Sequence, residues 1–97
     1  MRERICAAID GQRLLAVDYE GWPRTVEPHA YGESPEGHEL LRAFQVSSTA
    51  EPAALLGWAL FRVEAISGIN VLDTVFAGPR PGYHRDDSDI RKIHCQL

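Results

Sequence analysis

The stretch from residue 24 to residue 45 constrains the fold more than any other part of the chain. It contains two strand-like runs, RTVEPHAY and HELLRAFQ, on either side of a polar tip with a Ser-Pro-Glu-Gly turn. Side chains alternate between two faces along a strand, and Pro28 lacks the N–H that a central strand would donate. We therefore predict a hairpin that has an edge position or a bulge at Pro28.

The two runs also predict which side chains share a face. In the first run, Val26 and Ala30 fall on one face, opposite Thr25, Glu27, His29 and Tyr31. In the second run, the mostly apolar phase contains Leu40, Arg42, Phe44 and Val46, and the other phase contains Glu39, Leu41 and Gln45. An arginine in an apolar phase is costly if it is buried without a partner. Arg42 is therefore predicted to lie at a strand end, to pair with a carboxylate, or to line a pocket.

The rest of the chain continues the β-rich pattern behind one short helix. Apolar residues at i, i+3 and i+4 predict an amphipathic helix over residues 2–10, with Gly11 at its C-terminal cap. Further strands are predicted at 13–20, 58–63 and 69–73, with a 3₁₀ turn at 64–67. Residues 48–56 read as a loop with a helical turn at 52–56. The end of the chain, 90–97, fits either a strand or a last helical turn.

The length of 97 residues allows one domain with one thin core. One helix and five short strands are typical of a small five-stranded barrel of the SH3 or Sm type. We therefore predict a mainly β domain over 1–97. It would consist of an N-terminal helix (1–12), a barrel (13–73) and a C-terminal strap (74–97), in which a Gly-Pro-Arg-Pro-Gly-Tyr stretch covers an open sheet edge.

Composition excludes several functional classes. The formal net charge of −4 argues against a general nucleic-acid binder, which depends on many phosphate contacts. No nucleophile elbow, phosphate-binding loop or zinc-protease motif is present, so we expect no enzyme and no cofactor. The charged start has no apolar signal segment, and no apolar run reaches the ~20 residues of a membrane span. These features predict a cytoplasmic protein.

The chain has two cysteines, Cys6 and Cys95, near its opposite ends. A disulfide between them is conceivable, because the termini of a domain often lie close together. Two reduced thiols are the simpler interpretation for a cytoplasmic protein.

These elements carry a set of residues in a fixed order along the chain. The set is Tyr19, Arg24, Val26, Pro28, Leu41, Ala43, Phe44, Phe61, Arg62 and Ile66. This pattern resembles the WYL domain, a small Sm-like barrel often attached to bacterial helix-turn-helix regulators. The resemblance covers about residues 2–73, and Glu39-Leu40-Leu41 stands where the family has Trp-Tyr-Leu. It implies a ligand-sensing module for nucleotides or single-stranded nucleic acid that takes part in transcription regulation, here as a stand-alone relative.

The candidate ligand-binding residues are basic and aromatic. Arg24, Arg42 and Arg62 come from three strands, and guanidinium groups bind phosphate or carboxylate with two donors each. Aromatic side chains beside that charge could stack a base. The predicted ligand is an anionic small molecule, such as a nucleotide, or a short single strand. The candidate ligand-binding set is Tyr19, Arg24, His29, Tyr31, Arg42 and Arg62, with Trp22 as a further stacking candidate.

Each candidate also has a structural interpretation. The arginines could form ordinary ion pairs with Glu27, Glu39 and Glu64. Half-buried tyrosines often pack the ring against the core and expose only the hydroxyl to solvent. His29 and His38 lack metal-binding spacing, so no metal site is predicted. The alternative function is a protein-interaction module that pairs an exposed strand edge with a partner or with a second copy.

Overall fold

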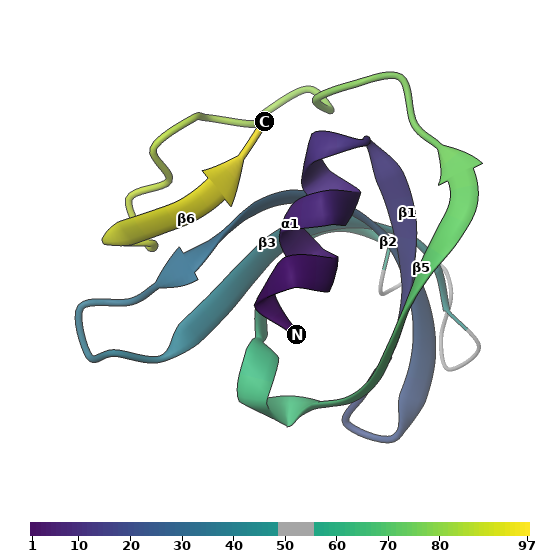
Figure 1. Ribbon diagram of the computed structural model, residues 1–97, viewed down its shortest axis with the longest axis horizontal. Helices are drawn as coiled ribbons and strands as arrows, with labels where there is room; N and C mark the ends of the chain where they lie inside the picture. Colours follow the sequence, from purple (N-terminus) through teal and green to yellow (C-terminus); the bar gives the residue numbers. More distant parts are fainter. Residues whose placement is uncertain (49–55) are drawn as a thin grey trace.

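The structure, a computed structural model, describes residues 1–48 and 56–97. It is mainly β, with one N-terminal helix and an antiparallel sheet (Figure 1). The elements in chain order are α1 (Arg2–Asp10), β1 (Arg13–Tyr19), β2 (Trp22–Glu33), β3 (Glu39–Ser48), β4 (Gly57–Arg62), the 3₁₀ helix η1 (Val63–Ala65), β5 (Ile66–Val75) and β6 (Lys92–Gln96).

The predicted helix, the predicted strands and the 3₁₀ turn before the fifth strand are confirmed to within a few residues. The end of the chain forms a strand, β6, rather than a helical turn. The helical turn expected at 52–56 lies, apart from Leu56, outside the described residues.

The sheet has six strands rather than the predicted five. Neighbouring strands follow the order β4-β3-β2-β1-β5, and β6 pairs with β2 beside this path. The extra strand fits because β2 is long: residues 22–26 pair with β1, and residues 30–33 pair with β6. The sheet is not closed in the described part of the chain, so a barrel is not confirmed.

A bulge in β2 changes which residues share a face. The register of β2 against β3 shifts between Pro28 and Ala30, which confirms the irregularity predicted at Pro28. Because of this shift, Tyr31 joins Val26 in the main core, whereas Ala30 lies in a second cluster. The prediction that Val26 and Ala30 share a face, with Tyr31 opposite, is therefore wrong. One inserted residue moves every following side chain to the other face.

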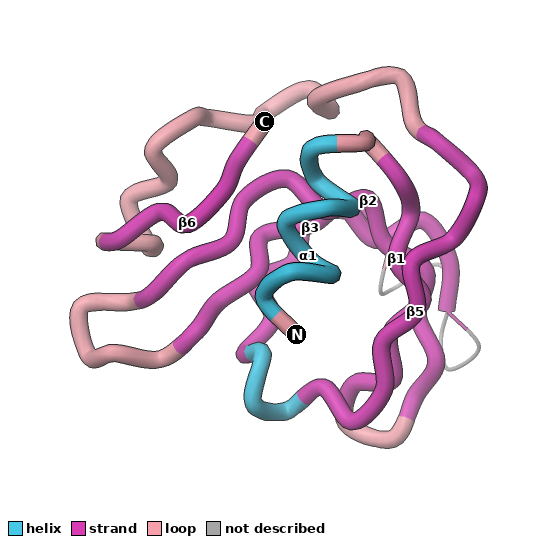
Figure 2. The backbone as a smooth tube through the Cα atoms, viewed as in Figure 1, coloured by secondary structure: helices cyan, strands magenta, loops and turns pink. Residues whose placement is uncertain are grey.

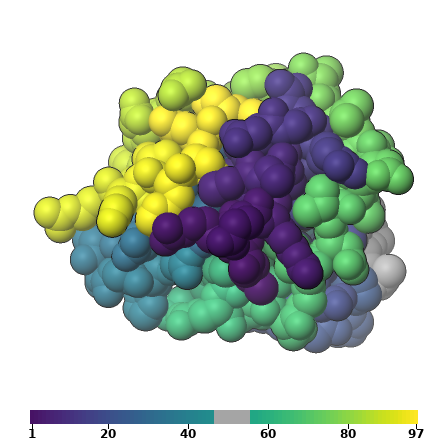
Figure 3. Space-filling view, in the orientation of Figure 1, coloured from purple at the N-terminus to yellow at the C-terminus, as the bar shows by residue number. Residues whose placement is uncertain are grey.

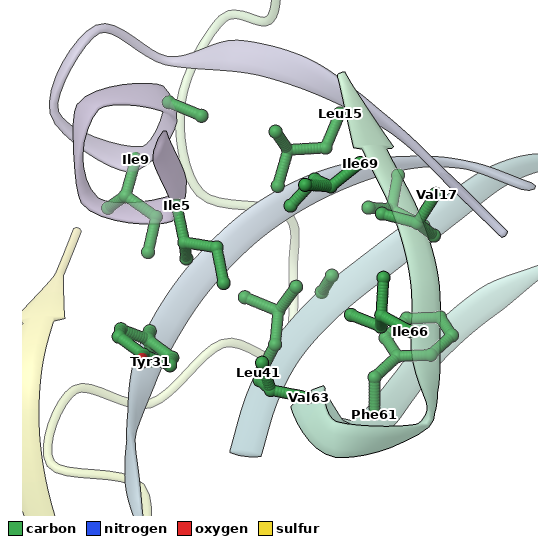
Figure 4. Close-up of a cluster of buried hydrophobic side chains, with 13 residues drawn as sticks. Ile5, Ile9, Leu15, Val17, Tyr31, Leu41, Phe61, Val63, Ile66 and Ile69 are labelled. Atoms are coloured by element: carbon green, nitrogen blue, oxygen red, sulfur yellow. The ribbon is translucent and has the colours of Figure 1, made fainter. Parts of the chain in front are cut away.

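The main core lies on the inner face of the curved sheet, the face that carries Tyr31, Leu41 and Phe61 (Figure 4). Helix α1 lies across the hollow of the sheet, between β6 on one side and β1 and β5 on the other (Figure 2). It buries Ile5, Ala8 and Ile9 there, the stripe that the helical spacing predicts. Nine residues are too few for a stable isolated helix, so this burial stabilises α1.

The outer face of the sheet, which carries Ala30, Arg42 and Leu60, is covered by the C-terminal segment. Residues 74 and 75 of the predicted strap belong to β5, so from here on the name strap refers to residues 77–97. Ile90 of the strap packs against Ala30 and Leu40, and the half-buried Tyr83 and Ile93 extend this second cluster. Both faces of β3 are therefore covered. The phase with Leu41 and Gln45 faces the main core, and the mostly apolar phase with Leu40 and Arg42 faces the strap.

Cys6 of α1 and Cys95 of β6 form a disulfide, with their Cα atoms 5.7 Å apart. The preference for two reduced thiols is therefore wrong. The register of β6 on β2 brings the last strand beside the first helix, and Figure 3 shows the two ends of the chain in contact on one surface. The disulfide links residues 89 positions apart in the sequence.

Among the described residues, no helix is long and apolar enough to cross a bilayer.

Candidate functional site

Arg42 is held by the strap. Its Nε donates to Asp87 Oδ2 at 2.7 Å, and its Nη2 donates to Asp89 Oδ2 at 2.7 Å. The hydrogen bond with Asp87 is the main cause that raises the pKa of Arg42. Burial alone would raise the pKa of Asp87, but the hydrogen bonds from Arg42 and from the Asp89 N–H lower it below its usual value. The strap therefore supplies two carboxylates to Arg42, where the predicted partners were glutamates.

Arg62 lies on the same face of the sheet as Arg42. Arg62 pairs with Leu40 of β3, and Leu40 is two residues from Arg42, so the two side chains share a face. Its Nη2 pairs with Glu64 and also contacts His38 Nδ1 at 3.0 Å. The Arg62 side chain is half exposed. The ordinary ion pair with Glu64 is thus present, and it holds the guanidinium beside η1.

Arg24 lies on the opposite face of the sheet from Arg42 and Arg62, in a different environment. Its register partner on β1 is Val17, a core residue, so the Arg24 side chain enters the inner face. The guanidinium carbon lies 5.2 Å from the centre of the Tyr19 ring and 5.9 Å from that of Phe61. Only 11% of the side chain is exposed, and the contact with Glu20, at 4.0 Å, is at the limit of an ion pair.

Two buried donors on the inner face lack acceptors. Within the described ranges, Arg24 Nε and Gln45 Nε2 are the two buried side-chain nitrogen or oxygen atoms without a hydrogen-bond partner. Gln45 is 1% exposed and pairs with Val26, two residues from Arg24 on β2. A buried donor without an acceptor costs about 1–3 kcal/mol, and more when it is charged. Arg24 and Gln45 therefore form a donor pair that an acceptor would satisfy.

The sequence did not single out Gln45, because an amide in a strand reads as an ordinary exposed position. Gln45 lies in the same strand phase as Leu41 and Ala43, and both of these are core residues. This shared phase was the sequence pattern that could have predicted the burial of Gln45.

The aromatic candidates separate into two groups. Tyr19 lies with Arg24, packs edge-on against Phe61 at 4.8 Å, and accepts a hydrogen bond from the Arg62 N–H at 3.3 Å. Trp22, in the same hairpin, is 49% exposed. Tyr31 is buried in the main core and its hydroxyl donates to Glu39. Tyr19 and Trp22 are thus near Arg24, whereas Tyr31 packs in the main core.

His29 is fully buried on the outer face, where the β2 bulge places it among Trp58, Phe76 and Tyr83. Its Nδ1–H donates to the Glu27 carbonyl at 2.8 Å, and its Nε2 accepts from the Arg80 N–H at 3.1 Å. These two bonds fix a neutral tautomer. Burial is the main cause that lowers the pKa of His29, and the hydrogen bond to the Glu27 carbonyl opposes this effect in part. His29 thus anchors the strap, and a ligand has no access to it in this conformation.

Glu27 pairs with Arg80 of the strap rather than with Arg24, Arg42 or Arg62. Arg80 donates to both Glu27 oxygens, at 2.8 and 3.0 Å, and its guanidinium lies 4.5 Å from the Phe44 ring centre. In the sequence, Arg80 is part of the Gly-Pro-Arg-Pro-Gly-Tyr stretch that is predicted to cover a sheet edge. The structure makes it a second fixed contact of the strap.

The candidate metal ligands are not brought together. His29 is enclosed by aromatic rings, and His38 lies beside Arg62 and Glu64. In the portion of the chain that is described, no three His, Cys, Asp or Glu side chains form a group that could hold a metal ion.

A cleft of about 480 Å³ lies between the sheet and the strap. Trp58 and Tyr83, 6.1 Å apart and nearly parallel, contribute its aromatic wall. Arg42 lines it too, but Asp86, Asp87 and Asp89 also do, so the charges on its lining are mostly negative. An anion is therefore better matched to Arg24 than to this cleft.

Comparisons of the chain with family models, with curated proteins and with solved structures found no match.

Proposed function

We propose that the chain is a non-enzymatic binding module for an anionic small molecule, such as a nucleotide or a short single-stranded nucleic acid, with Arg24 as the residue that meets the anion. The observation that carries this proposal is the buried Nε of Arg24, which has no acceptor within the described residues. Charge-assisted hydrogen bonds are roughly twice as strong as neutral ones. An anionic oxygen would therefore be the most stabilising partner for this donor.

The surroundings of Arg24 favour an anion with a planar group. Gln45 offers a second donor on the same face, and the Tyr19 ring holds the guanidinium in place. Trp22 is exposed at the tip of the same hairpin, where a base could stack on it. By contrast, the strap carboxylates hold Arg42, and Glu64 holds Arg62. The proposed site is thus centred on Arg24, with Tyr19, Trp22 and Gln45.

The fold is compatible with a WYL-type module of this kind. The N-terminal helix, the antiparallel sheet and the 3₁₀ helix between β4 and β5 support this proposal, because they are features from which an SH3 or Sm-like barrel is predicted. A regulatory role in transcription, in the cytoplasm, would follow from the same resemblance.

The test is a thermal-shift screen with inorganic phosphate, nucleotides, cyclic dinucleotides and short oligonucleotides, at low and moderate salt. A ligand at a hundred times its dissociation constant adds about 2.7 kcal/mol of stability, a shift of roughly 10–20 °C for a domain of this size. We expect Arg24→Gln to abolish the shift and Arg91→Gln, which removes an exposed arginine, to preserve it. A shift that survives Arg24→Gln would refute the assignment of the site to Arg24.

A second candidate function rests on the open sheet. β4 and β5 end the strand path, and each has only one neighbouring strand in the described part of the chain. Such edges can accept a strand from a partner or from a second copy. Light scattering over a concentration series tests this function. A dimer that forms equally well in Arg24→Gln, together with a flat ligand screen, would favour it over anion binding.

A further inference from the structure

The disulfide joins the two ends of the chain at the point where the strap is attached. Cys6 is on α1, Cys95 is on β6, and both side chains are half-buried rather than enclosed. Both residues also pack against the main core, so local opening at the chain ends, short of global unfolding, would admit a reductant to this bond. Disulfides with this access exchange more readily than buried ones.

The other attachments of the strap are non-covalent. The buried ones, Ile90 in the second cluster and Arg80 with His29 and Glu27, come before β6 in the chain. β6 itself pairs with only residues 30–33 of β2. The exposed Arg42–Asp89 pair contributes little, and short strands at the chain end open first. The covalent link is thus the strongest constraint on β6.

We propose that the Cys6–Cys95 disulfide is a redox site that latches the strap onto the sheet, and that a dithiol reductant releases it. One thiolate of the reductant attacks one sulfur of the disulfide, forms a mixed disulfide and releases the other cysteine as a thiolate. The second thiol of the reductant then attacks the mixed disulfide and releases the remaining cysteine. Two electrons and two protons pass to Cys6 and Cys95, and the reductant leaves as a disulfide. In a reducing compartment, such as the cytoplasm predicted from the sequence, the released form would predominate.

Release changes what the outer face presents. When β6 leaves β2, the edge at residues 30–33 loses its strand partner, and the buried contacts of Ile90 are no longer supported by a paired strand behind them. Once Ile90 also leaves the sheet, Asp87 and Asp89 move away from Arg42. The cleft between sheet and strap opens, which exposes Trp58 and a positive charge. This inference goes beyond the proposed function and does not depend on Arg24.

Native-state hydrogen exchange of the oxidised protein, with and without dithiothreitol, tests the latch. We expect amides of residues 92–96 to exchange at least about tenfold faster after reduction, whereas the β1–β2 pairs at residues 15–19 and 22–26 change less than about twofold. Cys95→Ser without reductant should match the reduced wild type. Reductant should have no further effect on Cys95→Ser, which controls for its other actions.

A fluorescence readout distinguishes release of the strap from general loosening. In the Trp22→Phe background, emission comes from Trp58, which touches the strap through Pro81 and Tyr83. Reduction should shift this emission to the red while the far-ultraviolet circular dichroism stays native-like. Three results would overturn the proposal: no change on reduction, equal acceleration of exchange in all strands, or complete unfolding. The last two results would mean that the disulfide stabilises the whole fold rather than the attachment of the strap.

Discussion

Replacing Gly32 by alanine should detach β6 from β2 without any change in redox state. A Cβ at Gly32 would lie 2.0 Å from the Lys92 carbonyl oxygen and 2.6 Å from Ile90 Cγ2. An ordinary contact needs about 3.4 Å, so the Lys92 backbone must move by roughly 1.4 Å (3.4 minus 2.0). A hydrogen bond of about 2.9 Å does not survive such a separation. The β6 pairing at Gly32 would therefore break.

The expected cost follows from this clash. Overpacking of this kind costs about 1–3 kcal/mol, which corresponds to roughly 4–24 °C in melting temperature for a domain of this size. Thermal and urea unfolding, each followed by circular dichroism, measure it. Hydrogen exchange should place the loss of protection in residues 92–96.

Gly68→Ala is the matched control for Gly32→Ala. Gly68 also lies in a strand, but a Cβ there would meet Asp18 Oδ2 at 2.8 Å, at the end of a side chain that can rotate away. We expect a cost below about 1 kcal/mol, since only one exposed rotamer must change. Equal stabilities of wild type and Gly32→Ala, or equal losses in the two variants, would refute the reasoning.

Two further perturbations test the strap contacts. Burial lowers the pKa of His29 in the folded protein, so the unfolded chain binds more protons as the pH falls. The contribution of the neutral His29 to stability is therefore complete above pH ~6.5 and is lost as the pH falls below this value. Unfolding free energies at pH 7.5 and 5.5 should therefore differ less in His29→Gln than in the wild type, and an unchanged difference would contradict a neutral buried imidazole. In a double-mutant cycle, Arg42→Ala and Asp87→Ala should show a coupling of about 0.5–3 kcal/mol, whereas additive losses would mean that the ion pair contributes nothing.

Local patterns predicted the parts of the fold that depend on local chemistry. The stripe Ile5, Ala8 and Ile9 specifies α1, and Pro28 marks the bulge because it cannot donate to a ladder. The direction of the shift at this bulge is set by tertiary packing, which is why the faces of Ala30 and Tyr31 were interchanged.

The strap was only partly predictable because its contacts are remote in sequence. Arg42 and Asp87 are 45 residues apart, and the two cysteines are 89 apart. Periodicity within a strand carries no information on such partners. The same limit applies to Arg24. A basic residue in a strand usually faces solvent, and its burial becomes visible only when its register partner Val17 is known to be in the core.

The most direct test of the anion-binding proposal is an NMR titration of the arginine Nε–Hε signals with inorganic phosphate and with a nucleoside monophosphate. Loss of one signal in Arg24→Lys assigns Arg24, and Arg91→Lys assigns an exposed reference arginine. We predict that the Arg24 signal shifts downfield and saturates with added anion, because its unpartnered Nε gains a charged acceptor. An Arg24 signal that stays unchanged while exposed arginines respond would contradict the proposal.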